Sequence, residues 1–107
     1  MKKVFNKLVR DNIPSIIENN GEKAIYRVLS DDEYIVELLK KLKEEVGEVL
    51  DSTNRDERLE ELADVFEVIK SIAEYDNSNI DEVIRIADNK REKRGGFSKK
   101  YFLEKTK

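Results

Sequence analysis

The stretch SDDEYIVELLKKLKEEVGEVLDSTNRDERLEELADVFEVIKSIAEY, residues 30–75, decides the fold. Ser30 and Asn54 each stand three residues before a glutamate, an arrangement that satisfies the unpaired N–H groups of a first helical turn. After each of these caps, apolar residues recur every three or four positions, which is the period of an amphipathic helix. The stretch therefore predicts two long helices, 31–51 and 55–75.

The flanking sequence predicts two more helices. Asn79 begins a third capping pattern, and the helix that follows is expected over 80–94 with Gly95 as its stop. A short helix is expected to begin at Pro14, because proline is tolerated in a first turn, and to end before Gly21.

A short strand is the remaining expected element. Residues 23–29, KAIYRVL, alternate between the two faces of an extended chain, and Tyr101-Phe102-Leu103 is a segment that could pair with them. At 107 residues the chain is expected to form one domain over 1–107. The expected fold class is therefore mainly α: a helical bundle with a minor short β element.

The apolar surface is expected to need a partner. Hydrophobic residues make up 38% of the chain and charged residues 42%, which leaves a small core. On the helix over 55–75 the apolar residues cover an arc of about 220°. One chain cannot enclose so wide a face, so we expect a homodimer or a dimer of dimers.

Two acidic motifs carry the chemistry. EEVGE (residues 44–48) and ELAD (residues 61–64) each place carboxylates three residues apart, on one face of a helix. Such pairs repel each other unless a cation lies between them, and hard oxygen ligands suit magnesium or manganese better than zinc or copper. The sequence therefore predicts a Mg²⁺ site, with Mn²⁺ as the alternative ion. Its expected ligands are Glu45, Glu48, Glu61 and Asp64.

Glu61 is the most informative of these acids, because it falls inside the apolar arc of its helix. Burying a charged side chain on such a face costs roughly several kcal/mol of folding free energy unless the charge is paired or bound to a metal. A salt bridge to Lys41 or Arg10 is the alternative to a metal. Ordinary surface acids are expected at Glu44, Glu57, Glu60 and Glu67, which point outward.

The composition excludes several classes of chemistry. The chain has no cysteine and no histidine, so disulfides, thiolate metal sites and imidazole acid–base catalysis are excluded. A carboxylate is then the natural general base, and Glu44 and Glu45 are the candidates. The N-terminus lacks the apolar region of a signal peptide and no stretch has the length of a membrane span, so a cytoplasmic protein with no membrane partner is expected.

Charge is divided unevenly along the chain. Residues 90–107 hold eight Lys or Arg against two Glu, a net charge of +6, whereas residues 1–89 carry −9. The basic end is either a solvated tail or a rim that binds a polyanion next to an acidic centre. No nucleic-acid partner is expected, because the body is acidic and contains no recognised nucleic-acid-binding motif.

Two further blocks complete a family resemblance. KLVRDNIP (residues 7–14) and KREKRGGF (residues 90–97) flank the acidic motifs in an order that spans almost the whole chain. Together the four blocks resemble the MazG-like superfamily of all-α nucleoside triphosphate pyrophosphohydrolases, in particular its phosphoribosyl-ATP pyrophosphohydrolase-like branch.

The resemblance implies a reaction and a set of residues. The reaction is Mg²⁺-dependent hydrolysis of a nucleoside triphosphate between its α and β phosphates, which yields a monophosphate and pyrophosphate in nucleotide pool house-cleaning. Glu45, Glu48, Glu61 and Asp64 match the family's metal ligands. Glu44 is then expected to act through water or to orient the nucleophile. The expected phosphate-binding residues are Lys90, Arg91 and Arg94, together with Arg10, which is alternatively a clamp on the first helix.

Two alternatives remain open. The substrate is alternatively phosphoribosyl-ATP, although nothing in the sequence reads a phosphoribosyl group. The chain is alternatively a non-catalytic helical dimer that binds a partner or a nucleotide regulator. The acidic residues at an apolar boundary favour the enzyme, because a binding module has no need of them there.

Overall fold

The computed structural model describes residues 3–107, and over that range the chain is helical, without a β-strand. Its helices are α1 (Ile13–Asn19), α2 (Asp31–Asp51), α3 (Arg55–Tyr75) and α4 (Ile80–Arg94). The mainly α fold is thereby confirmed, and the bounds of the three long helices agree with those expected. No helix in the described range is long and apolar enough to cross a membrane.

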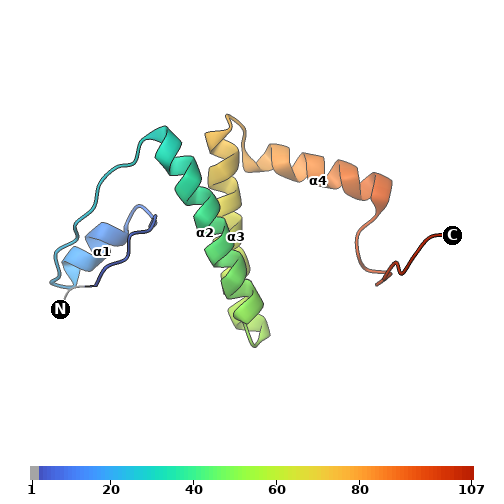
Figure 1. Ribbon diagram of the computed structural model, residues 1–107, viewed down its shortest axis with the longest axis horizontal. Helices are drawn as coiled ribbons and strands as arrows, with labels where there is room; N and C mark the ends of the chain where they lie inside the picture. The colour runs from blue at the N-terminus through green and yellow to red at the C-terminus, as the bar shows by residue number, and fades with distance from the viewer. Residues whose placement is uncertain (1–2) are drawn as a thin grey trace.

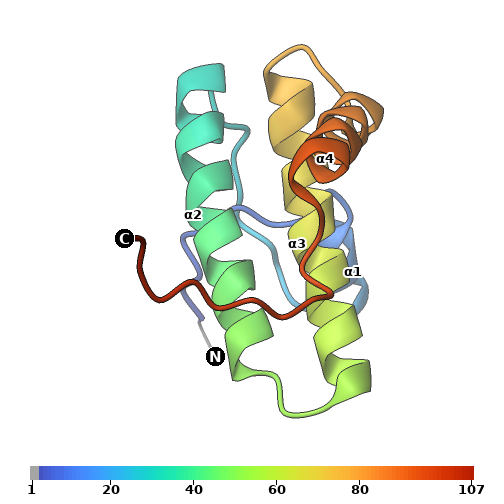
Figure 2. The same cartoon turned by 90° about the vertical axis from the view of Figure 1, so that its right-hand side faces the viewer.

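α2 and α3 form the centre of the molecule. They lie side by side as an antiparallel hairpin, with α1 and α4 on opposite sides of it (Figures 1 and 2). Leu38, Val68 and Ala73 are the buried hydrophobic residues of the described chain, and all three belong to this hairpin. Near its open end the rings of Tyr34 and Tyr75 meet edge to face, with centroids 6.3 Å apart.

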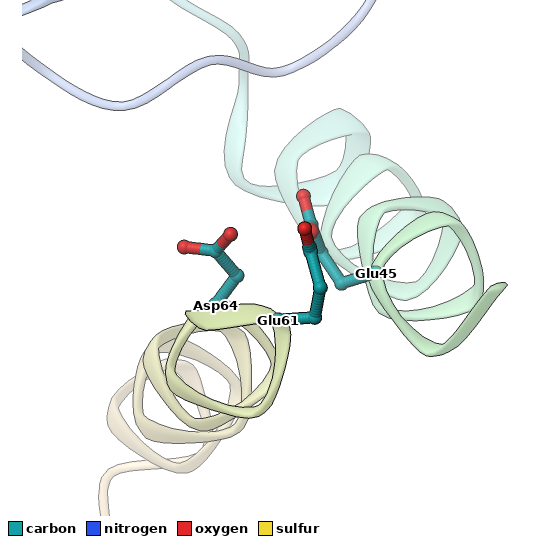
Figure 3. A group of neighbouring side chains, drawn as sticks. All are labelled: Glu45, Glu61 and Asp64. Carbon is teal, nitrogen blue, oxygen red and sulfur yellow. The ribbon is translucent and has the colours of Figure 1, made fainter. Parts of the chain in front are cut away.

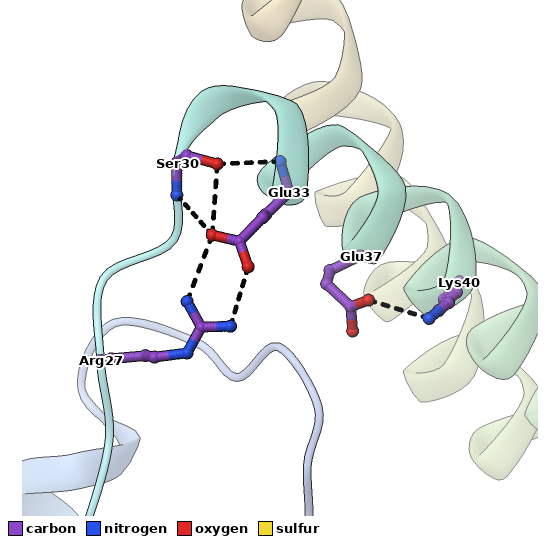
Figure 4. Close-up of polar contacts among 5 residues, drawn as sticks. All are labelled: Arg27, Ser30, Glu33, Glu37 and Lys40. Carbon is purple, nitrogen blue, oxygen red and sulfur yellow. Dashed lines mark hydrogen bonds and ion pairs between the residues drawn. The ribbon is translucent and has the colours of Figure 1, made fainter.

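Polar caps define where the long helices begin. The Ser30 hydroxyl accepts a hydrogen bond from the Glu33 N–H at 3.3 Å, and Glu33 Oε1 accepts one from the Ser30 N–H at 3.2 Å, a complete capping box (Figure 4). Asn54 and Asn79 cap α3 and α4 through their side-chain oxygens, which accept hydrogen bonds from the N–H groups of Glu57 and Glu82, without the reciprocal glutamate bond found at Ser30. Each cap satisfies a backbone group that the helix itself cannot pair, so the sequence sets these starts locally.

A second layer of polar contacts surrounds the first cap. The Arg27 guanidinium donates to both carboxylate oxygens of Glu33, at 3.2 Å and 2.8 Å, and Lys40 pairs with Glu37 one turn further along α2 (Figure 4). The hydrogen bond from Arg27, reinforced by the N–H of Ser30, lowers the pKa of Glu33 to about 2.

The prediction of a strand over residues 23–29 is wrong. Residues 22–29 have no regular secondary structure, and Ile25 and Val28 are 91% and 90% exposed. A strand needs a neighbour for its backbone hydrogen bonds, but residues 101–103 lie on the other side of the helix hairpin from residues 23–29 (Figure 1). Alternating side chains without a pairing partner do not make a strand.

The capping interaction at Glu33 predicts a pH dependence of stability. Because its pKa in the folded protein is about 2 against an ordinary value of 4.5, the stabilisation is complete above pH 4.5 and is lost as the pH falls towards 2. Glu33→Gln should therefore be less stable than the wild type at pH 7, and the difference should shrink by pH 3. Urea denaturation at the two pH values measures this. Glu104→Gln, in the C-terminal tail, is the control, and a difference that grows in acid would contradict the prediction.

Candidate metal centre

Three of the predicted acids meet on the helix hairpin. One carboxylate oxygen from each of Glu45, Glu61 and Asp64 lies within 4.8 Å of the other two. Glu45 comes from the middle of α2, whereas Glu61 and Asp64 are one turn apart on α3, and the carboxyl groups lie on one side of the helix pair (Figure 3). We call these three residues the acidic cluster.

The acidic cluster fits a hard divalent cation. Magnesium prefers oxygen ligands at about 2.1 Å, so two ligand oxygens of one ion are at most about 4.2 Å apart. The separations in the cluster are therefore close to those of a coordination sphere and need only small side-chain rotations to reach it. Three carboxylates without nitrogen or sulfur are a donor set for Mg²⁺ or Mn²⁺.

Glu61 has the electrostatic signature of a site that lacks positive charge. Partial burial raises the pKa of Glu61, and the negative charges of Glu48, Asp64 and Glu45 raise it further. None of the ion pairs found within residues 3–107 involves Glu61. A divalent cation would offset the negative charges that contribute to this shift.

Glu48 stands apart from the other predicted ligands. Its side chain is exposed and does not belong to the acidic cluster. Its charge nevertheless acts on Glu61, because it is the largest charge contribution to the raised pKa of that group. The structure thus brings together three of the four predicted ligands and leaves Glu48 at the edge.

Lys41 lies against the α2 side of the cluster. Its Nζ is 3.6 Å from Glu45 Oε1 and 3.6 Å from Glu44 Oε1, and the side chains of Lys41 and Glu45 are only 17% and 13% exposed. The salt bridge from Glu61 to Lys41 or Arg10, the alternative to a metal, is not found in the described chain. Lys41 pairs with Glu44 and Glu45 instead, and Arg10 pairs with Asp64.

Glu44 is held by two lysines. Lys7 Nζ donates to Glu44 Oε1 at 3.1 Å, and this hydrogen bond, together with the charge of Lys41, lowers the pKa of Glu44. A carboxylate with a lowered pKa is a weaker base. The contacts of Glu44 therefore favour an orienting role over proton abstraction.

The N-terminal segment supplies the cations at the cluster's open side. Arg10 Nη2 donates to Asp64 Oδ1 at 2.6 Å, and this pair joins residues that are 54 positions apart in the chain. The segment, in faint blue, passes on the side to which the carboxyl groups point (Figure 3). Arg10 was predicted as a site residue, but Lys7 was not, since a lone lysine before a short helix has no periodic signal.

The basic end of α4 lies away from the cluster. Lys90, Arg91 and Arg94 are exposed, and α4 runs outward from the hairpin on the side opposite to α1 (Figure 1). Because Arg10, just before α1, contacts Asp64, the cluster faces the α1 side. The structure of one protomer does not bring these three predicted phosphate-binding residues to the acidic cluster.

Comparisons with known proteins add one partial relative. No family model matches the chain, and no solved structure matches it. Over 54 residues the chain is 48% identical to an uncharacterized protein of Mycolicibacterium smegmatis (strain ATCC 700084 / mc(2)155). The match covers 50% of this chain and 55% of the relative, so the chain spans about half the length of that protein.

The raised pKa of Glu61 predicts that this residue destabilises the metal-free protein. A carboxyl whose pKa is raised on folding favours the folded state below its unfolded pKa, and this contribution is lost as the pH rises through the folded value. In EDTA at pH 7, Glu61→Gln should therefore melt at a higher temperature than the wild type, whereas at pH 4 the two should converge.

With metal in place of EDTA, the order of the two melting temperatures should be reversed. Mg²⁺ at 100 times its Kd should stabilise the wild type by about 2.7 kcal/mol and Glu61→Gln much less. Glu60→Gln, the neighbouring exposed acid, should behave as the wild type in both conditions. A lower melting temperature for Glu61→Gln in EDTA would contradict the prediction.

Proposed function

We propose that this protein is a Mg²⁺-dependent nucleoside triphosphate pyrophosphohydrolase that acts in nucleotide pool house-cleaning. It would cleave between the α and β phosphates to give a nucleoside monophosphate and pyrophosphate. The observation that supports this most directly is the acidic cluster of Glu45, Glu61 and Asp64, drawn from two helices into one place. The four sequence blocks that resemble the MazG-like superfamily provide the reaction class.

The residues divide the work of this reaction. Glu45, Glu61 and Asp64 would hold Mg²⁺, which supplies charge neutralisation for the phosphate oxygens and activation of a water nucleophile. Glu48, at the edge of the cluster, would add a further negative charge next to the metal. Glu44 would orient the attacking water, since its own pKa is lowered by Lys7 and Lys41. Without histidine in the chain, a carboxylate would have to accept the proton of that water, and Glu45 would be the better candidate.

The extended shape of the chain supports a dimer. A folded monomer of 12.5 kDa exposes about 6,200 Å², whereas this chain exposes 9,969 Å². Its radius of gyration is 18.2 Å, against about 13 Å for a compact domain of this length. The excess of about 3,800 Å² per chain amounts to about 7,500 Å² for a pair, which is more than the roughly 2,000–5,000 Å² that many obligate dimers bury in total. We infer a homodimer or a dimer of dimers.

The apolar side chains available for that interface are on the helices. They include Leu39 and Val46 of α2, Leu59, Leu62 and Phe66 of α3, and Val83, Ile84 and Ile86 of α4, all of which are exposed. An apolar groove of about 330 Å³ between α3 and α4, lined in part by Ile69, Ile72 and Val83, adds to this surface.

A dimer would also bring the basic end of α4 to a substrate. Within one protomer, α4 runs away from the acidic cluster (Figure 1). Lys90, Arg91 and Arg94 would therefore bind the phosphates of a nucleotide held at the cluster of the other copy, where they neutralise the charge of the departing pyrophosphate.

The reaction is tested by pyrophosphate release. Ribo- and deoxyribonucleoside triphosphates, and phosphoribosyl-ATP as the alternative substrate, are supplied with Mg²⁺, Mn²⁺ or EDTA. Metal-dependent pyrophosphate is expected from the wild type, and Glu61→Gln should reduce kcat/KM by at least about 100-fold. Glu60→Gln is the matched control and should retain wild-type turnover. A folded, metal-loaded wild type that releases no pyrophosphate from any substrate would contradict the proposal and favour a binding module.

The shared site is tested by mixing two inactive variants. Glu61→Gln lacks a metal ligand, and the double variant Arg91→Ala, Arg94→Ala lacks phosphate contacts. If the two sets act across the interface, mixed dimers contain one intact site, so co-refolding should restore activity that neither variant has alone. Light scattering of the wild type should give about 25 kDa or more. A 12.5 kDa monomer at micromolar concentration, or no recovery on mixing, would exclude the shared site.

A further inference from the structure

The N-terminal segment is tied to the helix hairpin by two cations. Lys7 donates to Glu44 of α2 at 3.1 Å, and Arg10 donates to Asp64 of α3 at 2.6 Å. α1, which follows directly, packs against none of the other helices in the described chain. We call residues 3–12 the N-terminal arm. Its two ion pairs reach both helices of the hairpin, and Leu8 and Val9 between them are half-buried.

The two ion pairs differ in whether their acid belongs to the acidic cluster. Asp64 belongs to the acidic cluster, so the guanidinium of Arg10 sits where a divalent cation would find one of its ligands. Glu44 lies outside the cluster, so the Lys7 pair is compatible with a bound metal. The arm therefore has one contact that conflicts with metal binding and one that does not.

We propose that Arg10 is an internal counter-ion of the metal centre, which a divalent cation displaces from Asp64, while Lys7 keeps the arm attached. This inference rests on the proposed metal centre. Metal binding would thereby free the Arg10 guanidinium at the rim of the site, where it can meet an anionic ligand. Arg10 would then be a positioning residue whose guanidinium contacts Asp64 only in the metal-free protein.

The energies indicate that a divalent cation would displace Arg10 from Asp64, and that Arg10 would not block metal binding. The side chains of Arg10 and Asp64 are 56% and 42% exposed, and exposed ion pairs contribute only about 0.2–1 kcal/mol. A divalent ion carries twice the charge of a guanidinium and interacts with three carboxylates at once. The Arg10 pair is strong enough to neutralise Asp64 in the free protein and weak enough to yield to the metal.

Calorimetric titration of the full chain with Mn²⁺ tests this proposal without any substrate. Arg10→Gln removes the competing cation and should bind Mn²⁺ about two- to fivefold more tightly than the wild type. Arg10→Lys keeps the charge and should bind as the wild type. Arg27→Gln is the matched control: it removes an exposed arginine–carboxylate pair of the same kind, at Glu33, and should leave the affinity unchanged.

The movement of the arm provides a second measurement. The chain has no tryptophan, so Asp11→Trp would place a single reporter next to Arg10, on the side away from the Lys7 attachment. Mg²⁺ should lower the fluorescence anisotropy of this reporter when Arg10 is present. In the Arg10→Gln background the anisotropy should be low from the start and respond little to Mg²⁺.

The outcomes separate this inference from the proposed function. A wild type that binds no Mn²⁺ would overturn the metal centre itself. Measurable binding that Arg10→Gln leaves unchanged or weakens, or that Arg10→Lys tightens as much as Arg10→Gln, would overturn only the counter-ion role. Anisotropy that Mg²⁺ does not change would show that Arg10 stays on Asp64 and would overturn the displacement.

Discussion

Repulsion between carboxylates of two adjacent helices is the constraint on which this structure depends. Packing α2 against α3 places carboxylate oxygens of Glu45, Glu61 and Asp64 within 4.8 Å of one another, and partial burial together with the neighbouring negative charges raises the pKa of Glu61. Arg10 offsets the negative charge at Asp64 and Lys41 offsets it at Glu45, while Glu61 keeps no such partner among residues 3–107. Three carboxylates this close together, one of them without a cationic partner among residues 3–107, support the proposed cation site.

The hairpin that bears this repulsion has little core to resist it. Leu38, Val68 and Ala73 are its buried hydrophobic residues, so its helices depend heavily on local chemistry at their ends. The caps at Ser30, Asn54 and Asn79 each hold an end in place, at a value of about 1 kcal/mol per cap. Local stabilisation of this size can define the helices but cannot cover their apolar faces, and the large exposed area of the chain follows from this.

The parts of the fold that the sequence predicted are those encoded locally. The caps mark the helix starts because a serine or asparagine and a glutamate three residues later act within one turn. The strand failed because residues 23–29 show alternation but have no neighbour, and pairing is a non-local property. The same division holds at the site. Glu61 and Asp64 follow from helical spacing, and their meeting with Glu45 follows from an antiparallel hairpin, whereas Lys7 reaches Glu44 across 37 positions through a segment without periodicity.

The separation of charge along the chain connects the site to assembly. The cations that pair with acids of the two acidic motifs are Lys7, Arg10 and Lys41. All three come from the first half of the chain, although the basic excess lies beyond residue 89. α4 holds four of the cations beyond residue 89 and runs away from the acidic cluster, and none of the four pairs with the cluster within residues 3–107. An exposed ion pair between Arg10 and Asp64 suits the proposed exchange of this counter-ion for a metal, whereas a permanent lysine-rich surround would exclude the metal. In the proposed dimer, positive charge on the far side of each protomer would leave the acidic cluster open to a cation, and the second copy would supply that charge where a polyphosphate binds.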